Sequence, residues 1–196
     1  MAHAVLPIEK CSPLRYSFSW YGSRRGTDMK QKVLRISEQL AETIRTWDTV
    51  DTITLADSAY EEIYDPYFYI SLDIYYDNAI LPQQRRKKFF PDSVAFETIN
   101  DRRKDRFLLE DLPIRLEYKE KGMIEQMIEK PEEHMTTYSR IGTYGLYRIL
   151  NADLLYARSS WLDDIKKRLY SLPDSFWLLL RTTFRASMAH ALSDLK

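Results

Sequence analysis

Residue types that build many functional sites are scarce in this chain of 196 residues. Cys11 is its single cysteine, so the chain can form no internal disulfide bond and no cysteine-based zinc site. The histidines His3, His134 and His190 stand far apart and lack the neighbouring ligands that a zinc site requires. This cysteine usage is typical of a reducing compartment, and we expect the protein to be cytoplasmic.

Long hydrophobic runs are also missing. The longest, Phe176 to Leu180, is too short to span a bilayer, and the residues after Met1 lack the apolar core of a signal peptide. We therefore expect no membrane segment. The sequence also contains no Walker loop, no Rossmann glycine fingerprint, no Gly-x-Ser-x-Gly motif and no Cys/His nucleophile pair, which argues against the corresponding classes of enzyme.

Basic residues are absent from one segment. The chain has 29 Lys plus Arg and 29 Asp plus Glu, and this zero net charge argues against nucleic acid or a membrane surface as a general partner. Residues 47–78, however, contain eight acids and no Lys or Arg, and residues 79–121 contain 11 bases and eight acids. An acidic segment is thus followed directly by a basic one.

The first 28 residues follow no hydrophobic period and include the aromatic patch Tyr16 to Tyr21. They predict a weakly structured arm over residues 1–28. From Met29 onward the sequence is periodic, and we expect a mixed core over residues 29–130 and a helical region over residues 131–196.

The predicted core contains one amphipathic helix and three strands. The helix is indicated by apolar residues that recur every three to four positions: Val33, Ile36, Leu40, Ile44 and Trp47. Residues 50–56, 67–76 and 112–119 alternate between two faces, which predicts strands. Asp73 lies on the less apolar face of the second strand, and Glu117 is the matching acid of the third.

The remaining segments are expected to be a connection and a set of helices. The segment between the second and third strands is basic and rich in turn residues, which indicates a turn-rich connection. Helices are predicted over residues 141–154, over residues 161–169 and from Asp174 onward. A capping box at Ser160 and Asp163 is predicted to begin the second of them.

This order of elements and its motifs resemble the nucleotidyltransferase superfamily and its polymerase-beta-like catalytic core. Leu55 to Tyr60 stands where that family has Gly-Ser at the end of a strand, and Ile70 to Ile74 stands where it has Asp-x-Asp. Ile114 to Tyr118 stands where a later strand supplies a third carboxylate. The resemblance implies an α+β fold, with a small mixed sheet followed by a carboxy-terminal helical bundle.

The resemblance also implies a function, namely magnesium-dependent transfer of a nucleoside monophosphate from a triphosphate to an acceptor. Asp73 and Glu117 would be the catalytic metal ligands, because Mg²⁺ binds carboxylate oxygens that converge from neighbouring strands. Ser58 would lie near the phosphates. Tyr69 and Tyr75, which flank the Asp73 face, would stack on the base, and Arg85 would contact phosphate.

Two signature positions depart from the family pattern. Asp57 replaces the glycine and puts a negative side chain where phosphate approaches, and Ser71 replaces the first metal-binding aspartate. The alternative function is therefore that of a catalytically inactive relative that binds a nucleotide or a protein. A third class is an interaction protein that forms a homodimer through its helices.

The same residues also have simpler interpretations. Asp73 would be a surface acid, and Glu117, which lies between Arg115 and Lys119 on one strand face, would belong to a cross-strand charge pattern. The basic run over residues 85–88 would be a solvated loop.

Overall fold

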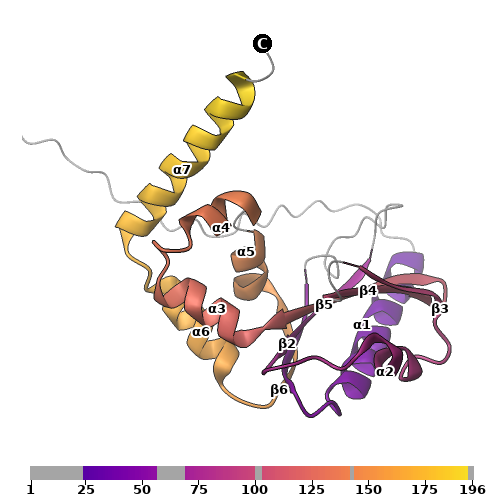
Figure 1. The fold of residues 1–196 in the computed structure, drawn as a ribbon. Coiled ribbons are helices and arrows are strands. Elements are labelled where there is room, and N and C mark those ends of the chain that lie inside the picture. Colours follow the sequence, from indigo (N-terminus) through magenta and orange to yellow (C-terminus); the bar gives the residue numbers. More distant parts are fainter. Residues whose placement is uncertain (1–23, 57–68, 100–102, 142–143, 194–196) are drawn as a thin grey trace, which may run out of the picture.

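The computed structural model describes residues 24–56, 69–99, 103–141 and 144–193. Over these ranges the chain forms a six-stranded mixed sheet and seven helices (Figure 1). The predicted α+β class with carboxy-terminal helices is confirmed. Most of the predicted amino-terminal arm lies outside the described residues.

The sheet has the strand order β3-β4-β5-β2-β1-β6, and within it β2 and β5 run parallel while the other neighbours are antiparallel. The strands are β1 (Val50–Leu55), β2 (Ile70–Tyr76), β3 (Val94–Ile99), β4 (Lys104–Leu109), β5 (Leu112–Glu120) and β6 (Asp153–Ala157). The three predicted strands correspond to β1, β2 and β5, which form the middle of the sheet.

The turn-rich connection between β2 and β5 contains regular elements that were not predicted. This segment contains α2 (Gln83–Lys88) and the strands β3 and β4, which extend the sheet beyond β5. Apolar and polar residues alternate only weakly in this segment. The reason is that β3 is largely exposed and has an irregular register near Ala95, whose φ is 54°. Glu110 and Asp111, both with positive φ, join β4 to β5 in a two-residue connection that fits a type I′ hairpin.

One hydrophobic cluster lies between the sheet and α1 (Arg24–Ile44). The apolar stripe of the predicted helix is buried there, against Ile70, Leu72 and Ile74 of β2 and the corresponding side chains of β5. The stripe is therefore confirmed. The helix itself begins at Arg24, upstream of Met29.

A second cluster lies on the other face of β2 and involves the later helices. These are α3 (Lys121–Glu129), α4 (Met135–Ile141), α5 (Tyr144–Asn151), α6 (Trp161–Tyr170) and α7 (Asp174–Ser193). Tyr75 of β2 belongs to this cluster together with Trp161 of α6. Helix α7 extends away from the rest of the molecule (Figure 1). None of the helices in the described ranges has the length and apolar character needed to cross a membrane.

The helical region differs from its prediction in two details. The helix predicted over residues 141–154 is wrong in extent, because α4 ends at Ile141, α5 ends at Asn151, and Leu154 lies in β6, which pairs with β1. The capping box is also wrong. Ser160 donates its side-chain hydrogen bond to Asp164 at 3.0 Å and caps no backbone N–H.

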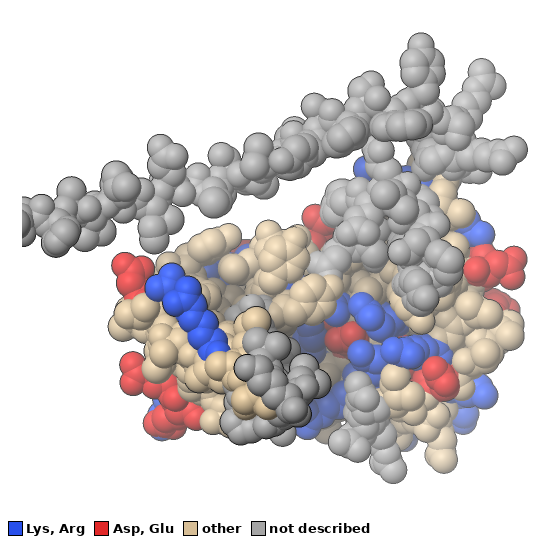
Figure 2. Space-filling view, turned by 90° about the horizontal axis from the view of Figure 1, so that it is seen from above, with Lys and Arg blue, Asp and Glu red and all other residues tan. Residues whose placement is uncertain are grey.

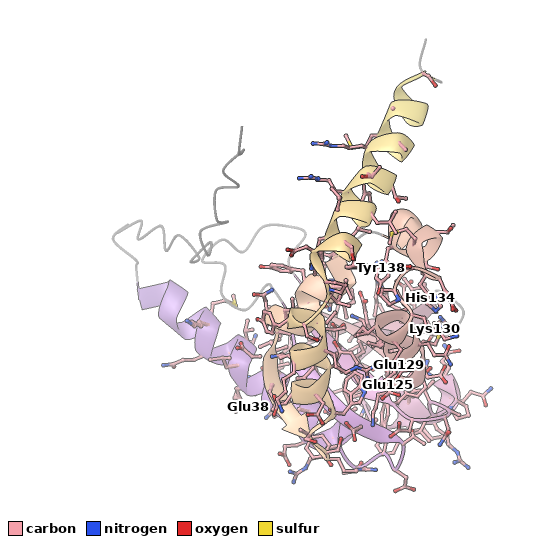
Figure 3. All side chains as sticks on the ribbon, turned by 90° about the vertical axis from the view of Figure 1, so that its left-hand side faces the viewer. Glu38, Glu125, Glu129, Lys130, His134 and Tyr138 are labelled. Atoms are coloured by element: carbon pink, nitrogen blue, oxygen red, sulfur yellow. The ribbon has the colours of Figure 1, made fainter. Side chains whose placement is uncertain are left out.

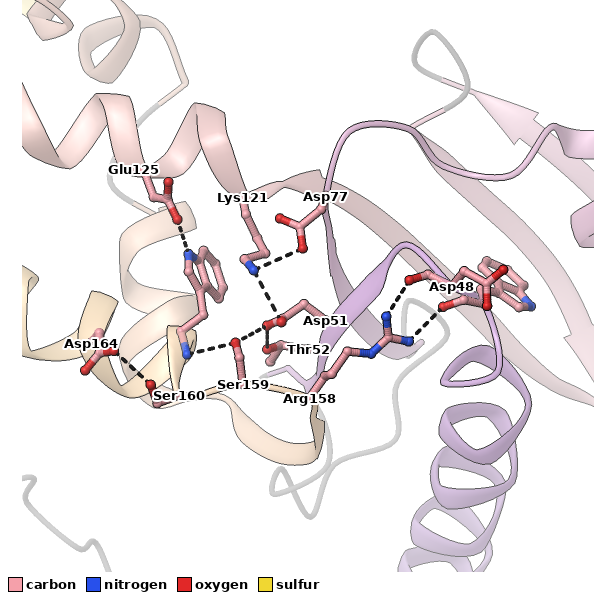
Figure 4. Close-up of polar contacts among 12 residues, drawn as sticks. Asp48, Asp51, Thr52, Asp77, Lys121, Glu125, Arg158, Ser159, Ser160 and Asp164 are labelled. Carbon is pink, nitrogen blue, oxygen red and sulfur yellow. Dashed lines mark hydrogen bonds and ion pairs between the residues drawn. The ribbon is translucent and has the colours of Figure 1, made fainter.

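Polar contacts tie β1 to the first turns of α3 and α6 (Figure 4). The buried carboxylate of Asp51 accepts hydrogen bonds from Thr52 at 2.8 Å and from Ser159 at 3.0 Å. Its other oxygen lies 3.3 Å from Nζ of Lys121, at the start of α3. The hydroxyl of Ser159 also accepts the backbone N–H of Trp161 at 3.2 Å. Helices and sheet are thus joined by hydrogen bonds as well as by packing.

Candidate functional site

The two predicted acids are neighbours in the sheet. Asp73 of β2 and Glu117 of β5 are direct partners in the parallel pairing, and Ser71 is the partner of Arg115 in the same way. Asp73 is fully buried, with 0% of its surface exposed, because α5 covers this part of the sheet. Its interpretation as a surface acid is therefore wrong.

Both carboxylate oxygens of Asp73 bind protein cations. Nζ of Lys119 donates to Oδ2 at 2.7 Å, and Nη2 of Arg148 donates to Oδ1 at 2.7 Å. Arg148 belongs to α5 and is itself buried. Its Nη2 also lies 2.9 Å from the hydroxyl of Ser71, the residue that replaces the family's first metal-binding aspartate.

Glu117 is surrounded by bases from three elements. Its Oε1 lies 3.0 Å from Nζ of Lys104 on β4, 3.3 Å from Nε of Arg115 on β5 and 3.4 Å from Nη1 of Arg148. The cross-strand charge pattern of Glu117 is therefore present, but it is mostly buried, since only 17% of the Glu117 side chain is exposed. The guanidinium of Arg148 contacts both acids and bridges them. In a view from above, Lys and Arg gather in the middle of this face, between the helical side and the sheet (Figure 2).

The two acids have opposite pKa shifts. Burial raises the pKa of Asp73 from its ordinary value, although Lys119 and Arg148 oppose that shift. Burial also acts to raise the pKa of Glu117, but Arg148, Lys104 and Lys119 outweigh it, so the net shift is downward. The surrounding bases thus favour the charged form of Glu117, whereas burial opposes the charged form of Asp73.

Three buried tyrosines are expected to set a sharp alkaline limit to the stability of the fold. Burial raises the pKa of Tyr138 to about 12, and it also raises the pKa of Tyr75 and of Tyr118. A raised folded-state pKa stabilises the fold below the unfolded value of 10.0, and this contribution is lost as the pH rises through the folded value. Exposed tyrosines ionise first, and we expect the remaining rise in tyrosinate absorbance, from the buried tyrosines, to appear together with the loss of circular dichroism. Ionisation of all tyrosines in an intact fold would contradict this expectation.

The described residues do not fit a magnesium ion at this site. Mg²⁺ requires several free oxygen ligands in octahedral geometry, whereas both oxygens of Asp73 and one of Glu117 already contact cations. Across the described ranges, no group of three or more His, Cys, Asp or Glu is arranged to hold a metal ion. His134 lies near Lys130 and Tyr138, on the helical side (Figure 3). The prediction that Asp73 and Glu117 hold magnesium thus finds no support in the described residues.

The other predicted site residues do not come together at one place in the structure. Tyr69 contacts the charge network through Arg115, with the guanidinium groups of Arg106 and Arg115 at 5.7 and 5.5 Å from its ring centroid. Tyr75 is fully buried, 5.0 Å from the ring of Trp161, so it packs in the core and presents no ring for stacking on a base. Arg85 lies on α2 near Trp47, on the α1 side of the sheet, and thus away from Asp73. Ser58 and Asp57 lie outside the described residues.

The sequence did not indicate the roles of two buried bases, Arg148 and Arg86. Arg148 lies in a helix whose extent was predicted wrongly, and no local pattern marks it as the partner of Asp73. Arg86 belongs to the basic run that was interpreted as a solvated loop. It is buried, and its Nε donates to Asp105 at 2.7 Å. The spacing of Arg115, Glu117 and Lys119 was the one available signal of the charge network.

No protein-family model matches the chain, and no curated protein matches it. Among solved structures, the chain is similar to a nucleotidyltransferase-like protein from Exiguobacterium sibiricum, with 12% sequence identity and a TM-score of 0.42. The similarity covers 76% of this chain and 40% of that protein, so this chain spans well under half of its length. At this level the similarity carries no argument about function.

Proposed function

We propose that this protein is a non-catalytic, nucleotidyltransferase-like module that binds a nucleotide without magnesium. The observation that carries the proposal is the guanidinium of Arg148, which lies 2.7 Å from Asp73 and 3.4 Å from Glu117. A fixed cation between the two carboxylates supplies the positive charge that a metal would otherwise supply there. Unlike a metal ion, it cannot exchange ligands with a triphosphate or with an attacking hydroxyl.

The surface beside this bridge supports phosphate binding by side chains. Arg106 and Arg115 flank the ring of Tyr69, and Lys104 lies on the neighbouring part of β4. Nε of Arg106 is buried and has no hydrogen-bond partner among the described residues. Planar guanidinium groups bind phosphate oxygens through two parallel hydrogen bonds.

We expect ATP to bind equally well with and without Mg²⁺, and no pyrophosphate to be released. Isothermal titration calorimetry in EDTA and in Mg²⁺, together with a pyrophosphate assay, measures both. Arg106→Gln should weaken binding, whereas Arg35→Gln on α1 should not, because Arg35 contacts Glu110 and Gln39. Binding that requires Mg²⁺ and is lost in Asp73→Asn would contradict the proposal.

A magnesium-dependent transferase is the second candidate. It is favoured by the direct pairing of Asp73 with Glu117 across parallel strands, since acids on adjacent strands form such metal sites. In that case Mg²⁺ must displace Arg148 from the pair. Release of pyrophosphate from ATP in the presence of Mg²⁺, absent in Asp73→Asn, would establish this candidate.

A further inference from the structure

A cavity of about 430 Å³ lies where β5 meets α3, α4 and α5, in the size range of small-molecule sites. Its helical wall is apolar and consists of Met123, Ile124, Met127, Leu146 and Ile149. The strand side of the cavity carries the charged residues Arg103, Lys104, Glu117, Lys119 and Glu120 beside two tyrosines. The cavity thus has one apolar wall and one charged wall.

Three tyrosines line the cavity, and none presents an open ring face: Tyr76 is only 8% exposed and belongs to the hydrophobic cluster on the α1 side of the sheet. The ring of Tyr118 stacks on Trp47 at 6.2 Å between centroids, and the guanidinium of Arg86 lies 4.6 Å from its centroid. Tyr138 packs edge-on against Phe176, and its hydroxyl donates to the carbonyl of Met127 at 2.9 Å. A nucleobase needs a ring face for stacking and polar groups for its edges. The wall offers instead flexible aliphatic and thioether side chains, which adapt to an aliphatic chain.

The charged wall favours an anion. Lys104 and Lys119 are paired with Glu117 and Asp73 respectively. Arg103, by contrast, forms no ion pair within the described ranges and remains available at the cavity. The wall and the network behind it contain five bases and three acids: Arg103, Lys104, Arg115, Lys119 and Arg148 against Asp73, Glu117 and Glu120. The local excess of positive charge is therefore two.

We propose that this cavity binds an anion with an unbranched aliphatic body, whose carboxylate or phosphate lies at Arg103 and whose chain lies along the apolar wall. This inference goes beyond the proposed nucleotide site, which uses the Tyr69 side of the charge network.

Two helical glycines supply a matched test. A Cβ atom added at Gly145 or at Gly122 meets nothing within 4 Å, so either position accepts a larger side chain. Gly145 lines the cavity and Gly122 does not. Leucine at either position should also favour its helix, because glycine is the weaker helix former. Gly145→Leu therefore fills the cavity, and Gly122→Leu is its control.

The experiment is calorimetric titration of the full chain with decanoate, decyl phosphate, decanol and ATP. We expect decanoate or decyl phosphate to bind with a negative heat-capacity change, and the tighter of the two identifies the head group. Gly145→Leu should weaken that binding about tenfold or more, Arg103→Ala should weaken it, and Gly122→Leu should leave it unchanged. The proposal is overturned if neither anion binds, if decanol binds as tightly, or if Gly145→Leu blocks ATP instead. Failure of ATP binding alone would overturn only the nucleotide proposal.

Discussion

Replacing Arg148 by alanine is expected to lower the free energy of unfolding by about 3 kcal/mol, because removal of one partner of a buried ion pair leaves the other charge only partly compensated. Asp73 is fully buried and would keep Lys119 as its remaining cation in the network. The hydroxyl of Ser71 would lose a hydrogen bond as well. Urea denaturation monitored by tryptophan fluorescence measures the loss.

Two further variants sharpen the Arg148 prediction. Arg148→Lys keeps the charge but has no planar fork to reach both acids, so its stability should lie between those of wild type and Arg148→Ala. Arg35→Ala is the control, since Arg35 lies 2.6 Å from Glu110 in an equally short but exposed ion pair. Exposed pairs contribute little to stability. Equal losses in Arg148→Ala and Arg35→Ala would disprove a structural role for the Arg148 bridge.

The second large effect is expected at the buried pair of Arg86 and Asp105, on the α1 side of the sheet. Both side chains are at most 1% exposed. Asp105 accepts hydrogen bonds from Nε and Nη2 of Arg86 at 2.7 and 2.9 Å, from Tyr118 at 2.7 Å and from Thr98 at 2.5 Å. Arg86→Met and Asp105→Leu should each lower the free energy of unfolding by about 3–5 kcal/mol.

A double-mutant cycle distinguishes this effect from simple loss of packing. The Arg86→Met/Asp105→Leu double variant leaves no unpaired charge in the core, and it should lose clearly less stability than the sum of the two single variants. Urea denaturation of the four proteins gives the interaction energy. If the two losses simply add, the charges of Arg86 and Asp105 do not depend on one another, and the prediction is wrong.

Much of the fold could be predicted because its central elements have clear periods. In β2, Ile70, Leu72 and Ile74 alternate with polar residues, and α1 carries a continuous apolar stripe. Strands β3 and β4 have no such pattern, because they lie toward one edge of the sheet and β3 is mostly exposed. Leu154 of β6 follows Leu150 at helical spacing, so a strand was mistaken for the end of a helix.

The candidate site was predictable only in part, for a related reason. Strand alternation and the family resemblance placed Asp73 and Glu117 on one face, and the parallel pairing brings them together. The role of Arg148 depends on how α5 packs over the sheet, which is a tertiary contact between residues far apart in the sequence. Local patterns carry no information about such a contact. For the same reason they could not predict the pairing of Arg86 with Asp105.

The pairing of β6 with β1 has a consequence for the synthesis of the chain. Leu55 and Asp153 are partners across the sheet, although about half of the sequence lies between them. Until the segment around Asp153 has left the ribosome, β1 has an open edge, with unpaired backbone groups that another strand can occupy. Contacts this distant also slow folding. Chains that are interrupted before β6 are therefore expected to be the aggregating species, and chaperone dependence should end once Ala157 has emerged.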